Sequence, residues 1–230
     1  FTQDLQSQKV LKNIGIKEVI NSGSLKIERV VDQLSNNNKN EVINKYKGNN
    51  ICIVCGSTWE KDEKIIIKYI KESKNKNIKW IIAPHNISKT NIDRISTNLD
   101  SKFLIYSKIN ESNIHSNVLI LDTIGDLKNI YRYSDLSYVG GGMGYSGLHN
   151  ILEACVYKTP VIIGKNYSGF IEAEELVELG GVVSVKDYDE FKIEFENLIN
   201  NKEVIKNKAK IISSYFNSKL GALSIIQKEI

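Results

Sequence analysis

The sequence predicts an α/β fold with a parallel β-sheet at its centre. Seven short apolar runs rich in β-branched residues recur along the chain, and continuous runs of this length are typical of strands buried on both faces. Amphipathic helical patterns lie between many of these runs, which indicates a parallel sheet with helices on both sides. We expect the ligand site of such a sheet at the carboxyl ends of its strands.

The elements follow from these two patterns in chain order. Before the first strand we expect a helical stretch, a short strand at 17–23, a second helical stretch at 24–34 and a polar loop at 36–40. The seven predicted strands are 51–56, 78–84, 102–107, 117–122, 136–141, 159–164 and 181–185. Helical patterns between them cover 60–73, 88–99, 126–134, 148–157 and 171–179. The end of the chain, about 187–230, predicts two or more amphipathic helices.

The composition excludes several classes of protein. The net charge of +4 comes from lysines scattered among acidic residues. This distribution argues against a nucleic-acid partner, which needs a clustered basic face, but it suits a small anionic ligand. The apolar runs are shorter than the roughly 20 residues of a membrane-spanning helix, and the first residues lack the pattern of a signal peptide.

The three cysteines, Cys52, Cys55 and Cys155, do not form a disulfide framework. Cys52 and Cys55 match a CxxC spacing, but residues three apart in an extended strand point to opposite faces. We therefore expect both thiols to be part of the core rather than a disulfide or a metal site.

The stretch YVGGGMGYSGLHNILEAC, residues 138–155, contains five glycines within the eight positions 140–147. It could be a dinucleotide fingerprint, a phosphate cradle or a tight turn. A dinucleotide fingerprint follows the first strand, and an acid ends the next strand. Here the turn follows several strands and the next strand ends in VIIGKN, so NAD binding is disfavoured.

A phosphate cradle is the favoured interpretation of this loop, because glycines such as Gly141 and Gly142 let backbone N–H groups approach an anion and a following helix adds its dipole. His149 and Asn150 would lie in the first helical turn, with Glu153 one turn later on a similar face. Since a carboxylate repels phosphate, we expect Glu153 to accept hydrogen bonds from sugar hydroxyl groups. The alternative is a solvated surface glutamate.

Three other predicted strands also end in small polar groups. Ser57 follows the strand 51–56, His85 follows Pro84, and the sequence Asp122-Thr-Ile-Gly-Asp126 follows the strand 117–122. Taken singly, each segment is explained by a turn or a helix cap. Carboxyl ends of parallel strands meet at one edge of a sheet, so the sequence predicts that all four segments face one pocket.

The segments GSTWEKDE, IIAPHNI, LDTIGDL and YVGGGMGYSGLHNILEA occur in an order that resembles the C-terminal half of bacterial 3-deoxy-D-manno-octulosonic acid (Kdo) transferases. The stretch NILEACVYKTPVIIGKNYSGFIEAEELVELGG carries the most specific part, and the resemblance covers nearly the whole chain. It implies a GT-B glycosyltransferase, in which two Rossmann-like domains face each other and the second holds the donor, CMP-Kdo.

By this resemblance, the CMP contacts fall on Pro84, His85, Ile124, Gly125, Asp126, Asn150, Ile151, Leu152 and Glu153. Ser57, Gly141 and Gly142 are added from the physical argument above. Asn86 and Asp126 depart from the residues common in the family, but both stay polar. The resemblance further implies one CMP-Kdo-binding domain over 1–230, with a crossover segment at 1–22.

The implied reaction is an inverting transfer of Kdo from CMP-Kdo to a lipid A precursor, in lipopolysaccharide biosynthesis at the cytoplasmic face of the bacterial inner membrane. The family's general base is a glutamate of the first domain, which no residue of this chain matches. We therefore expect a piece of a longer enzyme that binds donor without turnover, uses neither metal nor cofactor, and meets the acceptor and the membrane surface through the other domain. The alternatives are a GT-B enzyme for UDP-sugars and a non-catalytic nucleotide-binding module.

Overall fold

A computed structural model describes the chain except for residues 36–38, 76, 100–101, 110–113 and 230. The chain divides into two compact units. The larger unit is Asn38–Ile212, and the smaller combines Phe1–Asn37 with Ser213–Ile230. All the predicted site residues belong to the larger unit.

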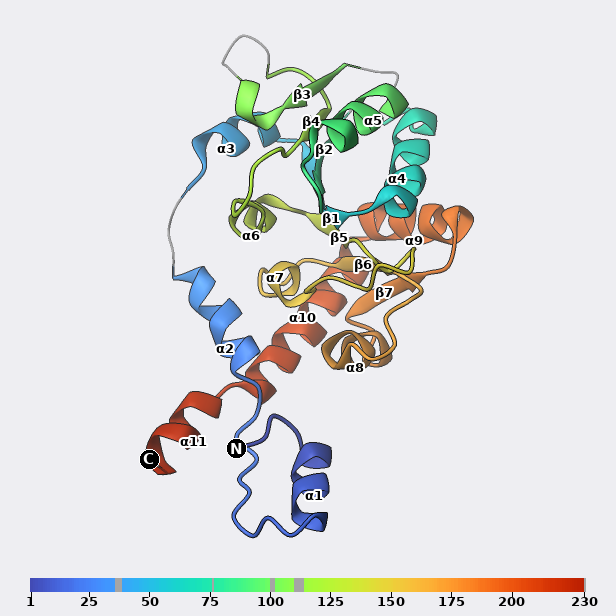
Figure 1. Ribbon diagram of the computed structural model, residues 1–230. Helices are drawn as coiled ribbons and strands as arrows, with labels where there is room; N and C mark the ends of the chain where they lie inside the picture. The colour runs from blue at the N-terminus through green and yellow to red at the C-terminus, as the bar shows by residue number, and fades with distance from the viewer. Residues whose placement is uncertain (36–38, 76, 100–101, 110–113, 230) are drawn as a thin grey trace. The chain divides into compact units, whose positions relative to one another are not determined.

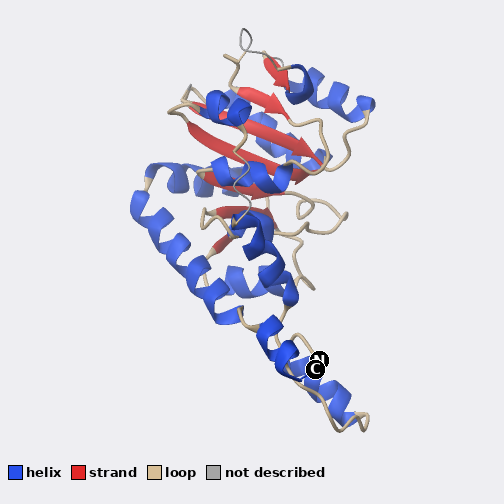
Figure 2. Cartoon of the chain, turned by 90° about the vertical axis from the view of Figure 1, so that its left-hand side faces the viewer, coloured by secondary structure: helices blue, strands red, loops and turns tan. Residues whose placement is uncertain are grey.

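The larger unit is built on a seven-stranded sheet in the order β3-β4-β2-β1-β5-β6-β7. All neighbouring strands pair in parallel, and the strands are the red arrows of Figure 2. Each of the seven predicted strands is confirmed. Their bounds are β1 Ile51–Thr58, β2 Ile78–Pro84, β3 Phe103–Ile105, β4 Val118–Ile120, β5 Leu136–Val139, β6 Val161–Gly164 and β7 Val182–Val185.

The strand order reverses between β1 and β5. From β1 the chain runs outward through β2 to β3 and β4, and it then returns to place β5 on the other side of β1. In open parallel sheets a ligand crevice lies outside the carboxyl ends of the strands at such a reversal. Here these ends are Thr58 of β1 and Val139 of β5, where the glycine-rich loop begins.

Helices cover both faces of the sheet in the larger unit (Figure 1). Helices α4, α5 and α9 pack on one face through a shared apolar cluster, and α3, α6 and α7 lie on the other. The bounds are α3 Glu41–Lys47, α4 Glu60–Glu72, α5 Lys89–Leu99, α6 Leu127–Ile130, α7 Leu152–Cys155, α8 Ile171–Glu178, α9 Tyr188–Asn200 and α10 Lys202–Lys219, the last of which continues into the smaller unit.

Two predicted helices are shorter than expected. The pattern at 126–134 forms α6 followed by a 3-10 turn, Tyr131–Tyr133. The pattern at 148–157 forms only the four residues of α7. His149 is held outside this helix because its amide donates to the Gly140 carbonyl oxygen at 3.1 Å. At the other end, Lys158 has a positive φ of 60°, which helical backbone does not allow.

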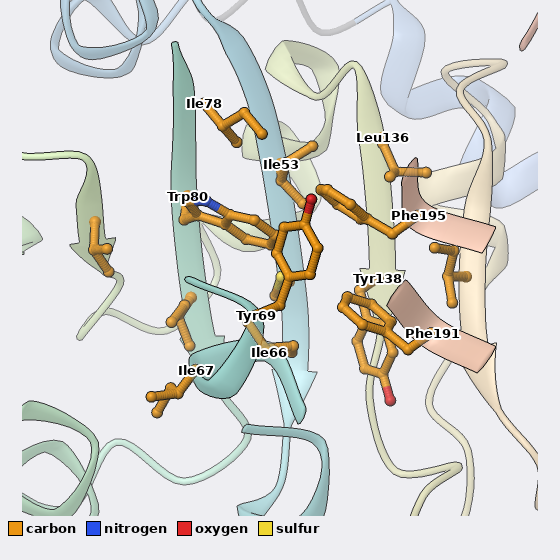
Figure 3. Packing of buried hydrophobic residues seen from close by; sticks show 14 of the residues in the cluster. Ile53, Ile66, Ile67, Tyr69, Ile78, Trp80, Leu136, Tyr138, Phe191 and Phe195 are labelled. Carbon is orange, nitrogen blue, oxygen red and sulfur yellow. The ribbon is translucent and has the colours of Figure 1, made fainter. Parts of the chain in front are cut away.

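An aromatic cluster forms the centre of the core on the α4 and α9 side of the sheet (Figure 3). The ring of Phe195 lies 4.6 Å from that of Tyr69 and 5.1 Å from that of Trp80, measured between centroids. Phe191 meets the rings of Tyr69 and Tyr138 edge-on. Alternate residues of β1 and β2, such as Ile78 and Trp80, point to this face of the sheet, where α4 and α9 pack against them.

The cysteines are free and buried, as predicted. Cys55 belongs to the apolar cluster shared by α4, α5 and α9, and Cys52 lies outside it, as expected for strand residues three apart. Burial raises the pKa of the Cys52 thiol to about 12, so this thiol stays protonated and unreactive near neutral pH.

The smaller unit contains α1 Leu5–Asn13, α2 Leu25–Val31, a 3-10 turn at Asp32–Leu34, and α11 Ala222–Glu229. The Glu28 carboxylate of α2 accepts hydrogen bonds from the amides of Gly221 and Leu223 at the start of α11. The expected strand at 17–23 is wrong, because Asn21 makes only an isolated bridge with Thr2.

Other expectations for this region stay open. The predicted crossover segment, 1–22, lies in the smaller unit. Residues 36–38 of the predicted polar loop lie outside the described residues. The single nucleotide-sugar domain over 1–230 remains a prediction.

Phe195→Ala should lower the free energy of unfolding by about 3 to 5 kcal/mol, because it opens a cavity among packed rings. The matched control is Ile193→Ala on the same helix, where the side chain is 67% exposed. That change should stay within about 0.5 kcal/mol. Urea unfolding measures both, and equal losses would contradict this description of the core.

Candidate functional site

The predicted site residues lie at one edge of the sheet. The strands β4, β2, β1 and β5 are consecutive neighbours, so their carboxyl ends form a continuous row. Pro84 ends β2 and His85 follows it, Ser57 is the second-last residue of β1, and the glycine-rich loop follows β5. The topology thus brings the four segments together at one edge.

Three aromatic side chains stack at this edge, from the ends of β1, β2 and β5. The ring of His85 lies 4.6 Å from Trp59 and 4.3 Å from His149, measured between centroids. The indole N–H of Trp59 donates to Nε2 of His149 at 3.0 Å. Trp59 could not be predicted from the sequence, because its contacts come from strand ends that are distant in the chain.

The indole hydrogen bond requires that Nε2 of His149 carry no proton. Consistently, the pKa of His149 is lowered from 6.5. Burial is the main cause, and the neighbouring His85 adds to it, whereas the charge of Asp62 acts in the opposite direction. His149 is therefore a neutral hydrogen-bond acceptor near neutral pH.

The glycine-rich loop, Gly140–Gly147, passes very close to its neighbours. A Cβ at Gly140 would lie 2.4 Å from the carbonyl oxygen of Ser57. Gly141 has a φ of +96°, and a Cβ there would lie 2.0 Å from the Gly147 carbonyl oxygen. These two positions require glycine for steric reasons.

The residue opposite the loop is itself unusual. Ser57 has a positive φ of 52°, at a point where the register of β1 against β2 shifts between Gly56 and Thr58. Such backbone is strained for a residue with a side chain, and strain of this kind concentrates at functional sites. The hydroxyl of the adjacent Thr58 is turned inward, where it donates to the buried carboxylate of Glu63 at 3.1 Å.

Asp62 of α4 holds the glycine-rich loop in place. Its side chain is 0% exposed, and each carboxylate oxygen accepts two hydrogen bonds. Oδ2 accepts from the amides of Trp59 and Gly141, both at 2.9 Å. Oδ1 accepts from the Tyr138 hydroxyl at 2.7 Å and from the Met143 amide at 3.3 Å.

This arrangement limits which amides of the predicted phosphate cradle can bind a ligand. The amide of Gly141 points to Asp62 rather than to a ligand, and that of Met143 does the same. The amide of Gly140 donates to the carbonyl oxygen of Gly56. The short α7 also supplies a smaller dipole than a long helix would. The role of Gly142 as a ligand contact stays a prediction.

The segment Asn150–Glu153 combines exposed polar atoms with buried apolar side chains. The Asn150 side chain accepts from the Leu152 amide at 3.1 Å and donates to the Glu153 carboxylate at 3.4 Å. Ile151 and Leu152 are buried, so only their backbone groups could reach a ligand. The half-buried Glu153 lies near the Tyr131 phenol, whose pKa is raised by burial and by this negative charge.

The loop after β4 is anchored at both ends and open in its middle. Asp122 accepts from the amide of Ser107 at 2.9 Å, and the Thr123 hydroxyl donates to Asp126 at 2.5 Å. Between them the Ile124 side chain is 87% exposed, and Gly125 has open space where a Cβ would lie. The contact of this loop with a flat ring stays a prediction.

A search of the described residues finds no group of three or more His, Cys, Asp or Glu side chains placed to hold a metal ion. Within the same part of the chain, no helix has both the length and the apolar character to cross a membrane.

Comparison with curated proteins identifies glycosyltransferases. The chain is 28% identical over 233 residues to a bifunctional glycosyltransferase/methyltransferase of Fusobacterium nucleatum, covering 98% of this chain and 36% of that protein. It is 31% identical to the Kdo transferase of Haemophilus influenzae, over 65% of this chain and 36% of the relative. It is 27% identical to the Kdo transferase of Aquifex aeolicus, over 85% of this chain and 52% of the relative. The chain thus spans about a third to a half of these relatives.

Solved structures share the fold. The C-terminal CMP-Kdo binding domain of WaaA from Acinetobacter baumannii matches with a TM-score of 0.67 and 19% identity, over 81% of this chain and 97% of that one. Anabaena HepE in complex with UDP-glucose matches with a TM-score of 0.58 and 15% identity, over 99% of this chain and 61% of that one. No family model matches the chain.

The α/β fold with its seven-stranded parallel sheet matches the C-terminal domains of GT-B proteins. Within that class, the chain is a homologue of the Kdo transferases. The expected α/β fold and the stated resemblance are therefore both confirmed.

Asp62→Asn should lower the free energy of unfolding by about 1 to 3 kcal/mol, since the new amide group leaves at least one buried N–H of the loop without an acceptor. Asp93→Asn, at an exposed position of α5, is the control and should change stability by less than about 0.5 kcal/mol. Chemical unfolding of the two variants is the measurement. An unchanged Asp62→Asn stability would show that the carboxylate does not hold the loop.

The imidazole of His149 should titrate below 6.5, with the midpoint moving upward in His85→Asn because one cause of the lowered pKa is removed. In the unfolded chain His149 binds its proton at higher pH, so folding stability should fall as the pH drops below about 6.5. NMR titration of the imidazole protons measures the midpoint. A midpoint above 6.5, or one unaffected by His85→Asn, would contradict the stacked arrangement.

Proposed function

We propose that this edge of the sheet binds CMP-Kdo and that the chain is the donor-binding half of a Kdo transferase. One observation carries the proposal. The three segments to which the family resemblance assigns CMP contacts follow β2, β4 and β5, whose carboxyl ends lie at the same edge of the sheet. The His85 ring stacks on His149, the neighbour of Asn150. The hydroxyl of Tyr157, just beyond α7, donates to the Lys128 carbonyl oxygen of α6 at 3.0 Å.

Each segment has a distinct task in binding CMP. The cytosine ring lies against the open loop at Ile124–Asp126 and the exposed His85. The ribose hydroxyls donate to Glu153, whose carboxylate Asn150 orients. The phosphate lies at the glycine-rich loop near Ser57. Of the two predicted glycine contacts, the Gly141 amide donates to Asp62, so Gly142 is the one proposed to contact the phosphate.

The chemistry we propose is an inverting transfer of Kdo to a lipid A precursor. A hydroxyl of the acceptor attacks the anomeric carbon, the bond to the phosphate oxygen breaks, and CMP departs. The proton of that hydroxyl passes to a general base, which the family resemblance assigns to a glutamate of the other domain. The relatives are two to three times as long as the matched segment, which leaves room for such a domain. The described chain then binds and orients the donor but does not turn it over.

On the same resemblance, we propose that the reaction belongs to lipopolysaccharide biosynthesis at the cytoplasmic face of the bacterial inner membrane. There the other domain would hold the acceptor and contact the membrane surface. A second candidate is a GT-B enzyme for a UDP-sugar, which the shared fold with HepE favours. A non-catalytic nucleotide-binding module is the third.

Calorimetry with CMP, CMP-Kdo, UDP and NAD separates these candidates. We expect CMP to bind more tightly than UDP, and NAD not to bind. Tighter binding of UDP would favour the UDP-sugar enzyme, and preferential binding of NAD would favour a dinucleotide module.

Glu153→Ala should weaken CMP binding at least about tenfold, or about 1.4 kcal/mol, because the ribose hydroxyls lose a charged acceptor. Its melting temperature should hardly change. Glu178→Ala, at an exposed position of α8, is the control and should bind CMP normally. Equal CMP affinity in the Glu153→Ala variant would mean that Glu153 is only a surface residue.

A further inference from the structure

We propose that Lys61 and Tyr145 form a subsite for the acidic sugar of the donor, in which the Lys61 ammonium group binds the sugar carboxylate and the Tyr145 ring covers an apolar face of the sugar. This inference rests on the proposed function, because it concerns the sugar end of the same ligand. Neither residue belongs to the CMP contacts inferred from the resemblance.

Several amides of the glycine-rich loop are already bonded within the protein. Asp62 takes the amides of Gly141 and Met143, and the Gly56 carbonyl oxygen takes that of Gly140. Three N–H groups of the glycine-rich loop are therefore directed inward. A donor with two negative groups, a phosphate and a carboxylate, then needs positive charge from side chains at the rim of the loop.

Lys61 supplies positive charge at this rim. It lies in the first turn of α4, directly after the end of β1, and its Nζ is 4.6 Å from the centroid of the Tyr145 ring. Its Cδ lies 3.7 Å from the position of a Cβ at Gly144. Among the described ion pairs, Lys64 on the same helix binds Glu60 at 2.7 Å, whereas Lys61 contacts an aromatic face instead of a carboxylate. Its ammonium group can therefore accept an anionic partner.

Tyr145 supplies the apolar part of the subsite. It lies within the glycine-rich loop, and its side chain is 95% exposed. An exposed aromatic ring offers a flat surface that is apolar in its body and polar at its tip. A cation near its face adds charge to that surface. A sugar ring that carries a carboxylate matches both features, whereas a neutral hexose has no negative charge to pair with the ammonium.

The position along the sheet edge brings Lys61 and Tyr145 near the sugar end of the donor. The proposed base contacts follow β2 and β4, whereas Lys61, Tyr145 and the proposed phosphate contacts Ser57 and Gly142 lie at the ends of β1 and β5. A donor whose base occupies the loop after β4 reaches the glycine-rich loop with its phosphate and passes it with its sugar. The sugar carboxylate then comes within reach of Lys61.

The test compares CMP with CMP-Kdo by calorimetry for the wild-type chain, Lys61→Ala, Lys61→Arg and Tyr145→Ala. We expect Lys61→Ala to weaken CMP-Kdo binding about tenfold and to leave CMP affinity within about twofold. Lys61→Arg should retain most of the CMP-Kdo affinity, and Tyr145→Ala should weaken CMP-Kdo more than CMP. Lys64→Ala is the matched control and should bind both ligands normally.

The outcomes separate this subsite from the proposed function. Wild-type binding of CMP tests the proposed function alone, because CMP lacks the sugar. If CMP binds and Lys61→Ala leaves CMP-Kdo affinity unchanged, the subsite is wrong and the function stands. If Lys61→Ala weakens CMP and CMP-Kdo equally, Lys61 contacts the phosphate and the carboxylate assignment is overturned.

Discussion

The buried carboxylate of Asp62 is the constraint on which the geometry of the site depends. It joins the first turn of α4, the end of β5 and two amides of the glycine-rich loop through four hydrogen bonds. A carboxylate removed from water needs such donors to offset its lost hydration. Because the loop satisfies them, its backbone is fixed before any ligand binds, and binding need not bear the cost of ordering it.

The same constraint divides the work among the residues at this edge. The inner surface of the glycine-rich loop is bonded to the protein itself, which leaves its outer rim, the stacked rings of Trp59, His85 and His149, and the half-buried Glu153 for a ligand. This division explains why a loop rich in glycine need not be a dinucleotide fingerprint. Here Gly140 and Gly141 are required for close packing against Ser57 and Gly147.

The sequence was sufficient for the sheet because each strand is a continuous apolar run, which is a local signal. The ends of these strands also located the candidate site, since parallel strands share one carboxyl edge. Asp62, Trp59 and the short α7 could not be found in this way, because their roles depend on partners distant in sequence. Asp62 pairs with Gly141 and Trp59 with His149. Asp62 lies near the start of the helix predicted at 60–73, but nothing local shows that its carboxylate also binds the glycine-rich loop.

A crystal structure of this chain with bound CMP tests the central claim most directly. The account predicts the nucleotide at the carboxyl ends of β2, β1 and β5, with the ribose against Glu153 and the hydrogen bonds from Gly141 and Met143 to Asp62 intact. Nucleotide bound elsewhere, or Glu153 directed away from it, would contradict the account. So would a loop that releases Asp62 to turn those amides toward the phosphate.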